Sequence, residues 1–244
     1  DFLGAVADST APGGLAANVA RLCASAGQVR ERMSTDNWHV LGRLPHRLPG
    51  PSPTVGEALD ALDEIMVSCV SLAGFAMDDM TRDESWRFLL LGRRLERLVH
   101  LAGVAGAVLG FSPDDRAEAL EWLLEAANSI VTFRARYRRA PELLPVLHLV
   151  VLDSSNPHAV MFQLRDLLQN LDASAEELGA AMPDAELRTL GQALAAVDLA
   201  PFEQQDTLAC EAACESLADL LGEVRSAAFR LSVALHRQFF SHAG

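Results

Sequence analysis

The stretch from Phe88 to Gly110 most constrains the fold, because two sets of residues in it follow helical spacing. One set is apolar and recurs at steps of three and four, which predicts the buried stripe of a long helix: Phe88, Leu91, Leu95, Leu98 and Ala102. The second lane is rich in glycine: Gly92, Glu96, Val99, Gly103, Gly106 and Gly110. Glycine inside a helix costs about 1 kcal/mol relative to alanine. The glycine lane therefore predicts close approach of another backbone.

Glu96 belongs to this lane, so we expect its carboxylate in a tight seam between two helices. A charge buried there without a partner would be unfavourable, which predicts a cationic partner. Arg134 is the leading candidate, because it shares a helix face with apolar residues and a short loop joins the two predicted helices. Arg21 or Arg30 could serve instead. A salt bridge that fixes helix register is the simpler interpretation, and a ligand-binding or catalytic role is the alternative.

Further polar residues stand at the end of the helix predicted for 112–137. Arg134, Arg136, Arg138 and Arg139 cluster there around Tyr137, and arginine guanidinium groups bind carboxylate or phosphate groups through two parallel hydrogen bonds. The alternative is that basic residues favour helix C-termini through the dipole. Asn128 lies on a largely apolar face of the same predicted helix. Asn156 precedes Pro157 and is expected to cap the next helix.

Helical patterns cover most of the chain, and no strand pattern with turn signals appears. We predict an all-α fold, an antiparallel multi-helix bundle with short loops, in a single domain over residues 1–244. Residues 1–14 are expected to form a loop or linker. The expected helices are 15–33, a short one after Ser34, 54–80, 84–110, 112–137, 141–152, one carrying Val160 to Leu171, 184–197 and 205–240.

Composition excludes several functional classes. The 244 residues carry a formal net charge of −13, which argues against nucleic acid as a partner. No apolar run reaches the roughly 18 residues that span a bilayer, and no basic leader is present, so we expect a cytoplasmic protein without a membrane partner. Every one of the 20 basic residues is arginine.

No motif in the sequence indicates a metal or an organic cofactor, and we expect neither. Cys210 and Cys214 share a helix face, but a metal site would need two more ligands and no matching pair is nearby. We expect these thiols, with Cys23 and Cys69, to be structural or inert.

Several short segments, in this order, resemble the alpha-E domain family of bacterial helical proteins with Glu-Arg motifs. They are Gly14 to Asn18, Arg30 to Ser34 with Asn37-Trp38, Met80 to Arg82, Trp86 to Leu89, Leu91 to Arg97, Ser129-Ile130 with Phe133 to Tyr137, Leu152 to Pro157, and Phe239 to His242. Such proteins usually open with an earlier helix that bears another Leu-Gly-Arg and Glu-Arg pair. The resemblance therefore implies that this chain is a fragment lacking that N-terminal helix.

The resemblance also implies a setting. Alpha-E domains accompany circularly permuted ATP-grasp ligases, fused or separate, and transglutaminase-like proteins, in systems thought to form peptide or amide bonds. Together with the motif, the polar residues above make up one candidate site. Its members are Arg93, Glu96, Arg97, Asn128, Arg134, Arg136, Tyr137 and Asn156.

Three functions are consistent with these observations. The first is a non-catalytic module that docks an ATP-grasp ligase and holds its peptide substrate. The second is an enzyme that acts on a peptide or amide bond through a cleft containing Glu96, Arg97, Arg134 and Tyr137. The third is a purely structural or oligomerising bundle. We rank them in that order, and whether the domain is an enzyme stays open at this point.

Overall fold

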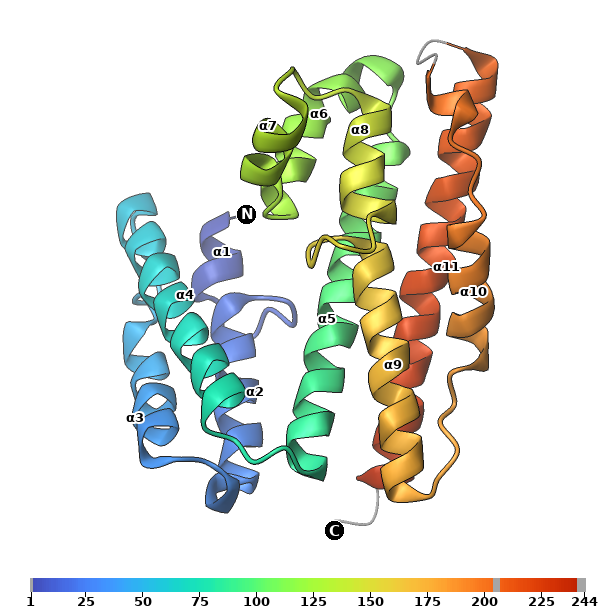
Figure 1. Cartoon of the computed structure of the whole chain (residues 1–244). Coiled ribbons are helices and arrows are strands. Elements are labelled where there is room, and N and C mark those ends of the chain that lie inside the picture. Colours follow the sequence, from blue (N-terminus) through green and yellow to red (C-terminus); the bar gives the residue numbers. More distant parts are fainter. Residues whose placement is uncertain (1, 204–206, 241–244) are drawn as a thin grey trace. The chain divides into compact units, whose positions relative to one another are not determined.

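A computed structural model describes residues 2–203 and 207–240. These residues form eleven α-helices and no strand, which confirms the predicted all-α class (Figure 1). Their contacts divide the chain into two compact units, residues 1–86 and 87–244. The antiparallel arrangement expected for the bundle as a whole stays a prediction.

The first unit is built from short elements around a small core. They are α1 (Phe2–Ala7), α2 (Leu15–Gln28), the 3-10 turn η1 (Arg30–Arg32), α3 (Thr35–Arg43), η2 (Leu44–Arg47) and α4 (Val55–Asp78). The core packs Val19 of α2 with Leu41, Leu44 and Ile65. The expected loop over residues 1–14 is therefore wrong at α1. The helix expected for 15–33 ends early because the chain tightens into η1.

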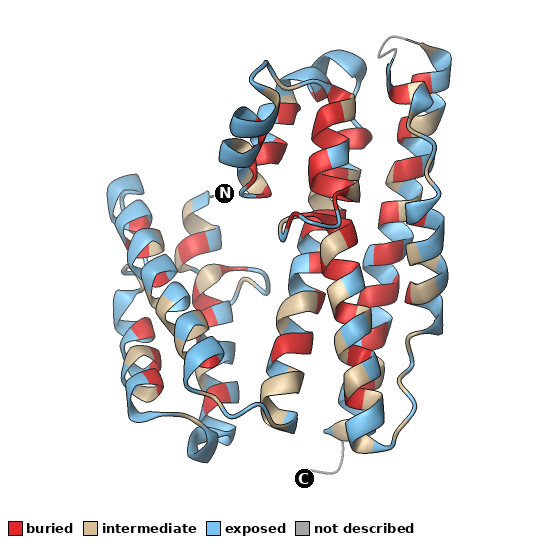
Figure 2. Ribbon diagram, in the orientation of Figure 1, coloured by how far each residue is buried: buried red, intermediate tan, exposed pale blue. Residues whose placement is uncertain are grey.

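The second unit begins within α5 (Glu84–Leu109), whose first turn belongs to the first unit. Its other elements are α6 (Pro113–Ala126), α7 (Ile130–Tyr137), α8 (Leu143–Leu147), the π-turn η3 (His148–Leu152), α9 (Val160–Leu178), α10 (Ala185–Ala195), η4 (Ala200–Glu203) and α11 (Leu208–Phe239). One continuous core joins them, and buried residues follow α8 and α9 along their length (Figure 2). Burial of this apolar surface is the main stabilising term.

The glycine lane of α5 meets α11 over part of its length. A Cβ at Gly106 would lie 3.6 Å from the backbone oxygen of Ala218, and one at Gly103 would lie 3.4 Å from Nε of Arg225. A Cβ at Gly92 would meet nothing within 4 Å. The predicted approach of another backbone is thus confirmed at Gly106. At Gly103 the neighbour is the side chain of Arg225, and at Gly92 there is none within 4 Å.

The helix predicted for 112–137 is in fact two helices, α6 and α7, separated by a turn at Asn128. Asn128 has φ +47°, in the left-handed region that ends a helix. Its N–H donates to the carbonyl of Glu125 at 2.8 Å, and the N–H of Ser129 donates to that of Leu124 at 2.7 Å. This pair of bonds is the Schellman motif, so Asn128 is an exposed helix stop and does not lie on an apolar helix face.

None of the helices formed by residues 2–203 and 207–240 combines the length and the apolarity that crossing a bilayer requires.

Candidate functional site

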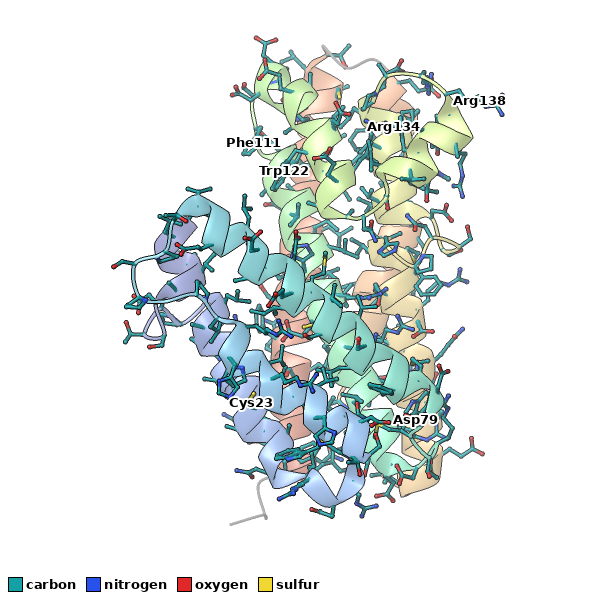
Figure 3. All side chains as sticks on the ribbon, turned by 90° about the vertical axis from the view of Figure 1, so that its left-hand side faces the viewer. Cys23, Asp79, Phe111, Trp122, Arg134 and Arg138 are labelled. Carbon is teal, nitrogen blue, oxygen red and sulfur yellow. The ribbon has the colours of Figure 1, made fainter. Side chains whose placement is uncertain are left out.

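The predicted pair of Glu96 with Arg134 does not form. Glu96 is exposed and has no ion pair within the described chain. Arg134, which is labelled in Figure 3, pairs instead with Glu121, Nη2 to Oε1 at 2.7 Å. Both side chains are more than half exposed. The cause is the stop at Asn128, because a new helix begins after it and the phase inferred from a continuous helix no longer holds.

Arg136 has a more buried partner. Its Nη1 lies 2.5 Å from Oδ2 of Asp153, whose side chain is 9% exposed. Burial acts to raise the pKa of Asp153. Hydrogen bonds from the hydroxyl and backbone N–H of Ser155 and from Arg136 outweigh it and hold this pKa at about 2. Asp153 is therefore a fixed negative charge that orders the segment following η3.

A second set of hydrogen bonds fixes the other end of this segment, residues 153–158, which we call the 153–158 loop. The buried amide of Asn156 donates to the carbonyl of Leu149 at 2.9 Å and to the hydroxyl of Ser129 at 3.2 Å. Its side-chain oxygen accepts from the N–H of His158 at 3.1 Å. Asn156 thus ties the loop to η3 and α7, and the side-chain cap expected for α9 is absent, since α9 begins only at Val160.

The same loop is also tied to α5. Gln163 is fully buried in the first turn of α9, and its amide donates to the carbonyl of Pro157. Its oxygen accepts from Nη1 of Arg94 at 3.4 Å, and Nε of Arg94 lies 2.5 Å from Oδ2 of Asp166. The charge of Arg94 is therefore used in a structural contact, which joins α5 to α9 beside the loop.

The arginines on either side of Arg94 are different. Arg93 and Arg97 stand one helical turn apart on α5 and have no ion pair with any residue that the structure describes. Burial and the neighbouring charges of Arg97 and Arg94 lower the pKa of Arg93. Burial and the charge of Arg97 likewise lower the pKa of His158. Positive charge is therefore concentrated here, and neither Arg93 nor Arg97 pairs with a carboxylate of the described residues.

We call Arg93, Arg97 and His158 the α5 arginine site. Two guanidinium groups and an imidazole offer hydrogen-bond donors of fixed shape, and a carboxylate or a phosphate oxygen is the complementary acceptor. Burial is the main cause of the lowered pKa values of Arg93 and His158, and a bound anion would offset the second cause, which is repulsion between neighbouring positive charges.

The structure brings some predicted residues together and separates others. Arg93 and Arg97 lie in the site, and Asn156 positions its third member, His158. Arg136 pairs with Asp153, which begins the 153–158 loop that ends at His158. The ring of Tyr137 packs on that of Phe133, with 4.8 Å between the ring centroids. The hydroxyl of Tyr137 lies 3.3 Å from Nδ1 of the exposed His148.

Asn128 and Arg134 do not belong to this site. Glu96 lies between its two arginines in the sequence, but it is exposed and forms no ion pair with the described residues. Sequence reasoning missed Asp153 and Gln163, although an acid and an amide next to apolar runs were visible signals.

A separate cluster holds two of the cysteines. Sγ of Cys210, Sγ of Cys214 and a carboxylate oxygen of Glu211 lie within 4.8 Å of one another. Arg116, which is 4% exposed, fills this space: its two terminal nitrogens bind the Glu211 carboxylate at 2.9 and 2.8 Å, and Nη1 lies 3.2 Å from Sγ of Cys214. Burial raises the pKa of Cys214 to about 12. A protonated thiol beside a guanidinium suits a structural clamp better than a metal.

Comparison with known proteins places this geometry in context. Residues 3–240 match the model of the Alpha-E family, described as a predicted alpha-helical domain with a conserved ER motif. The chain is 28% identical over 186 residues to an uncharacterized protein of Mycobacterium bovis and to one of Mycobacterium tuberculosis. The match covers 72% of this chain and 21% of each relative, so it spans about a fifth of their length. No solved structure matches the chain.

Proposed function

This chain belongs to the Alpha-E family of helical domains, and from that premise we propose that it is a non-catalytic binding module. Its α5 arginine site holds a carboxylate of a peptide that a partner ligase acts on. The observation that carries the proposal is the pair Arg93 and Arg97, two unbalanced guanidinium groups one turn apart beside His158. The family description names an ER motif, and Glu96-Arg97 is such a pair at this site.

Binding suits this site better than catalysis. The acid of the motif, Glu96, is exposed, and its carboxylate forms no hydrogen bond or ion pair with a described residue. Nothing described therefore fixes its position relative to a reacting group, as a general acid or base requires. The arginines carry the same charge at every accessible pH and cannot move protons. What they supply is orientation and charge for a bound anion.

We propose as partners a circularly permuted ATP-grasp ligase, fused or separate, and a transglutaminase-like protein. The proposal rests on the family resemblance. It is supported by the length of the mycobacterial relatives, in which the matched segment is about a fifth of the whole. A module of this kind works beside other domains, and a carboxylate is the group that an ATP-dependent ligase activates.

Binding of a carboxylate peptide tests the site. Calorimetric titration would compare triglutamate with triglutamine amide, which has the same backbone without the carboxylates. We expect triglutamate to bind, and the double variant Arg93→Gln/Arg97→Gln to lose about tenfold or more in affinity, since each charge-assisted bond contributes roughly 1.5–3 kcal/mol. Arg138→Gln is the matched control, because Arg138 is exposed and its side chain has no ion pair within the described chain.

Equal weakening in the control and the double variant would contradict the proposal, because it would mean that only overall charge matters. The partner claim has its own test, co-purification of the chain with the ligase. The double variant should release the peptide without releasing the ligase. Hydrolysis of peptide or amide substrates by the isolated chain, lost in Glu96→Gln, would support the enzyme alternative instead.

A further inference from the structure

The first unit contains a polar pocket of about 230 Å³ that is distinct from the α5 arginine site. It lies where η1 and the start of α3 face the segment between α4 and α5, which Asp79 begins (Figure 3). Three of the segments that carry the family resemblance, around Glu31, Asn37 and Thr81, contribute to it. Its lining is Glu31, Arg32, Ser34, Asn37, Asp79, Met80, Thr81, Asp83 and Ser85.

The charges in this pocket do not balance. Three carboxylates, Glu31, Asp79 and Asp83, face one cation, Arg32. Arg32 pairs with Asp83, Nη1 to Oδ2 at 3.7 Å. Glu31 and Asp79 have no ion pair with any of the residues described. Two acidic groups therefore stay available to a ligand of positive charge.

An amide oxygen on the pocket wall points the same way. Asn37 is only 4% exposed, and its amide nitrogen donates to the hydroxyl of Ser34 at 3.1 Å. Its side-chain oxygen accepts no hydrogen bond from any group in the described part of the chain, and this atom is not closed off from solvent. The oxygen of Asn37 is therefore an open acceptor for an N–H group of a ligand.

The walls of the pocket are held in place by their own bonds. Arg82 donates to the carbonyls of Met80, at 3.0 Å, and Met77, and its guanidinium stacks over the Trp86 ring at 4.6 Å. Asp83 caps α5 by accepting from the N–H of Trp86 at 3.1 Å. A site formed before the ligand arrives loses less entropy on binding.

The spacing of the acids separates two kinds of cation. A metal ion would need several ligand atoms close together, but no three acid, cysteine or histidine ligand atoms within 4.8 Å of one another occur here among the residues described. Carboxylates set further apart suit a cation whose N–H groups spread its charge. We propose that this pocket binds a small organic ammonium ion, with Glu31 and Asp79 as counter-charges and the Asn37 oxygen as acceptor.

Titration of the whole chain with 1,4-diaminobutane at low ionic strength tests this proposal, with 1,4-butanediol as the uncharged analogue. We expect the diamine to bind and the diol not to bind. Asp79→Asn and Glu31→Gln should each weaken the diamine about tenfold, the effect of losing one charge-assisted bond. Asp60→Asn is the matched control, an exposed acid on α4 that removes the same charge outside the pocket.

Nuclear magnetic resonance supplies a second readout that uses the native protein and does not depend on the folding of any variant. The side-chain amide signals of Asn37 should shift on addition of the diamine, while those of Asn18 should not. Three results would overturn the proposal: equal weakening in Asp60→Asn, an unmoved Asn37 signal at saturation, or binding of Mg²⁺ or Ca²⁺ through Asp79 in place of the diamine.

Discussion

His158 is the residue whose titration reports most directly on the α5 arginine site. Burial and the charge of Arg97 lower its pKa. Replacing Arg97 by glutamine removes a positive charge from its surroundings, so we expect the pKa of His158 to rise toward its usual value. Titration of the imidazole signals by nuclear magnetic resonance measures this, with the other histidines as internal references. An unchanged His158 would mean that Arg97 does not act on it.

Asp153 makes a prediction about acid stability. Its pKa is about 2 in the folded protein, against 3.8 for the free group. Because the folded value is the lower one, the stabilisation is complete above about pH 4 and is lost as the pH falls toward 2. Asp153→Asn should reduce the free energy of unfolding by about 2 kcal/mol at pH 6. Denaturant unfolding at several pH values checks this, and a difference that stayed constant down to pH 2 would contradict it.

The residue scale is also where sequence reasoning failed most clearly. Helical periodicity placed Glu96 beside the glycine lane, but the lane packs against α11 only further along α5, at Gly103 and Gly106. Periodicity gives the relative angle of residues around one helix. It does not give the length over which a neighbouring helix packs against that face. Arg93 and Arg97 were predicted from a motif, but only the coordinates reveal that neither forms an ion pair with another described residue.

At the scale of elements, Asn128 decides where α6 ends. The left-handed backbone conformation at this position raises the free energy of any residue with a Cβ by roughly 1 kcal/mol, and glycine avoids this cost. We therefore expect Asn128→Ala to lower the melting temperature, while Asn128→Gly leaves it equal or higher. Calorimetry of the two variants checks the order, and the reverse order would show that α6 and α7 do not meet in this turn.

The buried pair Arg116–Glu211 joins α6 to α11, and it predicts a strongly asymmetric response to mutation. Glu211→Gln leaves the guanidinium of Arg116 buried without its counter-charge and should cost about 2–3 kcal/mol of folding free energy. The double variant Arg116→Met/Glu211→Leu should recover part of that loss, because both desolvated charges are gone. Chemical denaturation measures both, and an additive double loss would contradict the buried pairing.

Element positions could largely be predicted from sequence, and element ends less well. The apolar stripe of 88–102 predicted α5, and the predicted starts at 54 and 112 coincide with Thr54 and Ser112, the residues that cap α4 and α6. α1 was missed because six residues are too few for periodicity to show. The break at Asn128 was missed because apolar spacing continues across it, and only the backbone conformation reveals the stop.

At the scale of the whole molecule, the net charge of −13 opposes the proposed ligand, because a carboxylate peptide is repelled by the average surface. Binding therefore depends on the local excess of positive charge at Arg93, Arg97 and His158. Electrostatic repulsion between protein and peptide is screened by salt. The pocket of the first unit, by contrast, has the same sign as the whole chain and attracts a cation.

The most direct test of the central claim is the pKa of His158 in the intact protein with and without saturating triglutamate. A carboxylate held by Arg93 and Arg97 places negative charge beside the imidazole, so the account predicts that the pKa of His158 rises on binding while the other histidines stay unchanged. An unchanged pKa of His158 at saturation would contradict the claim that this site binds the carboxylate.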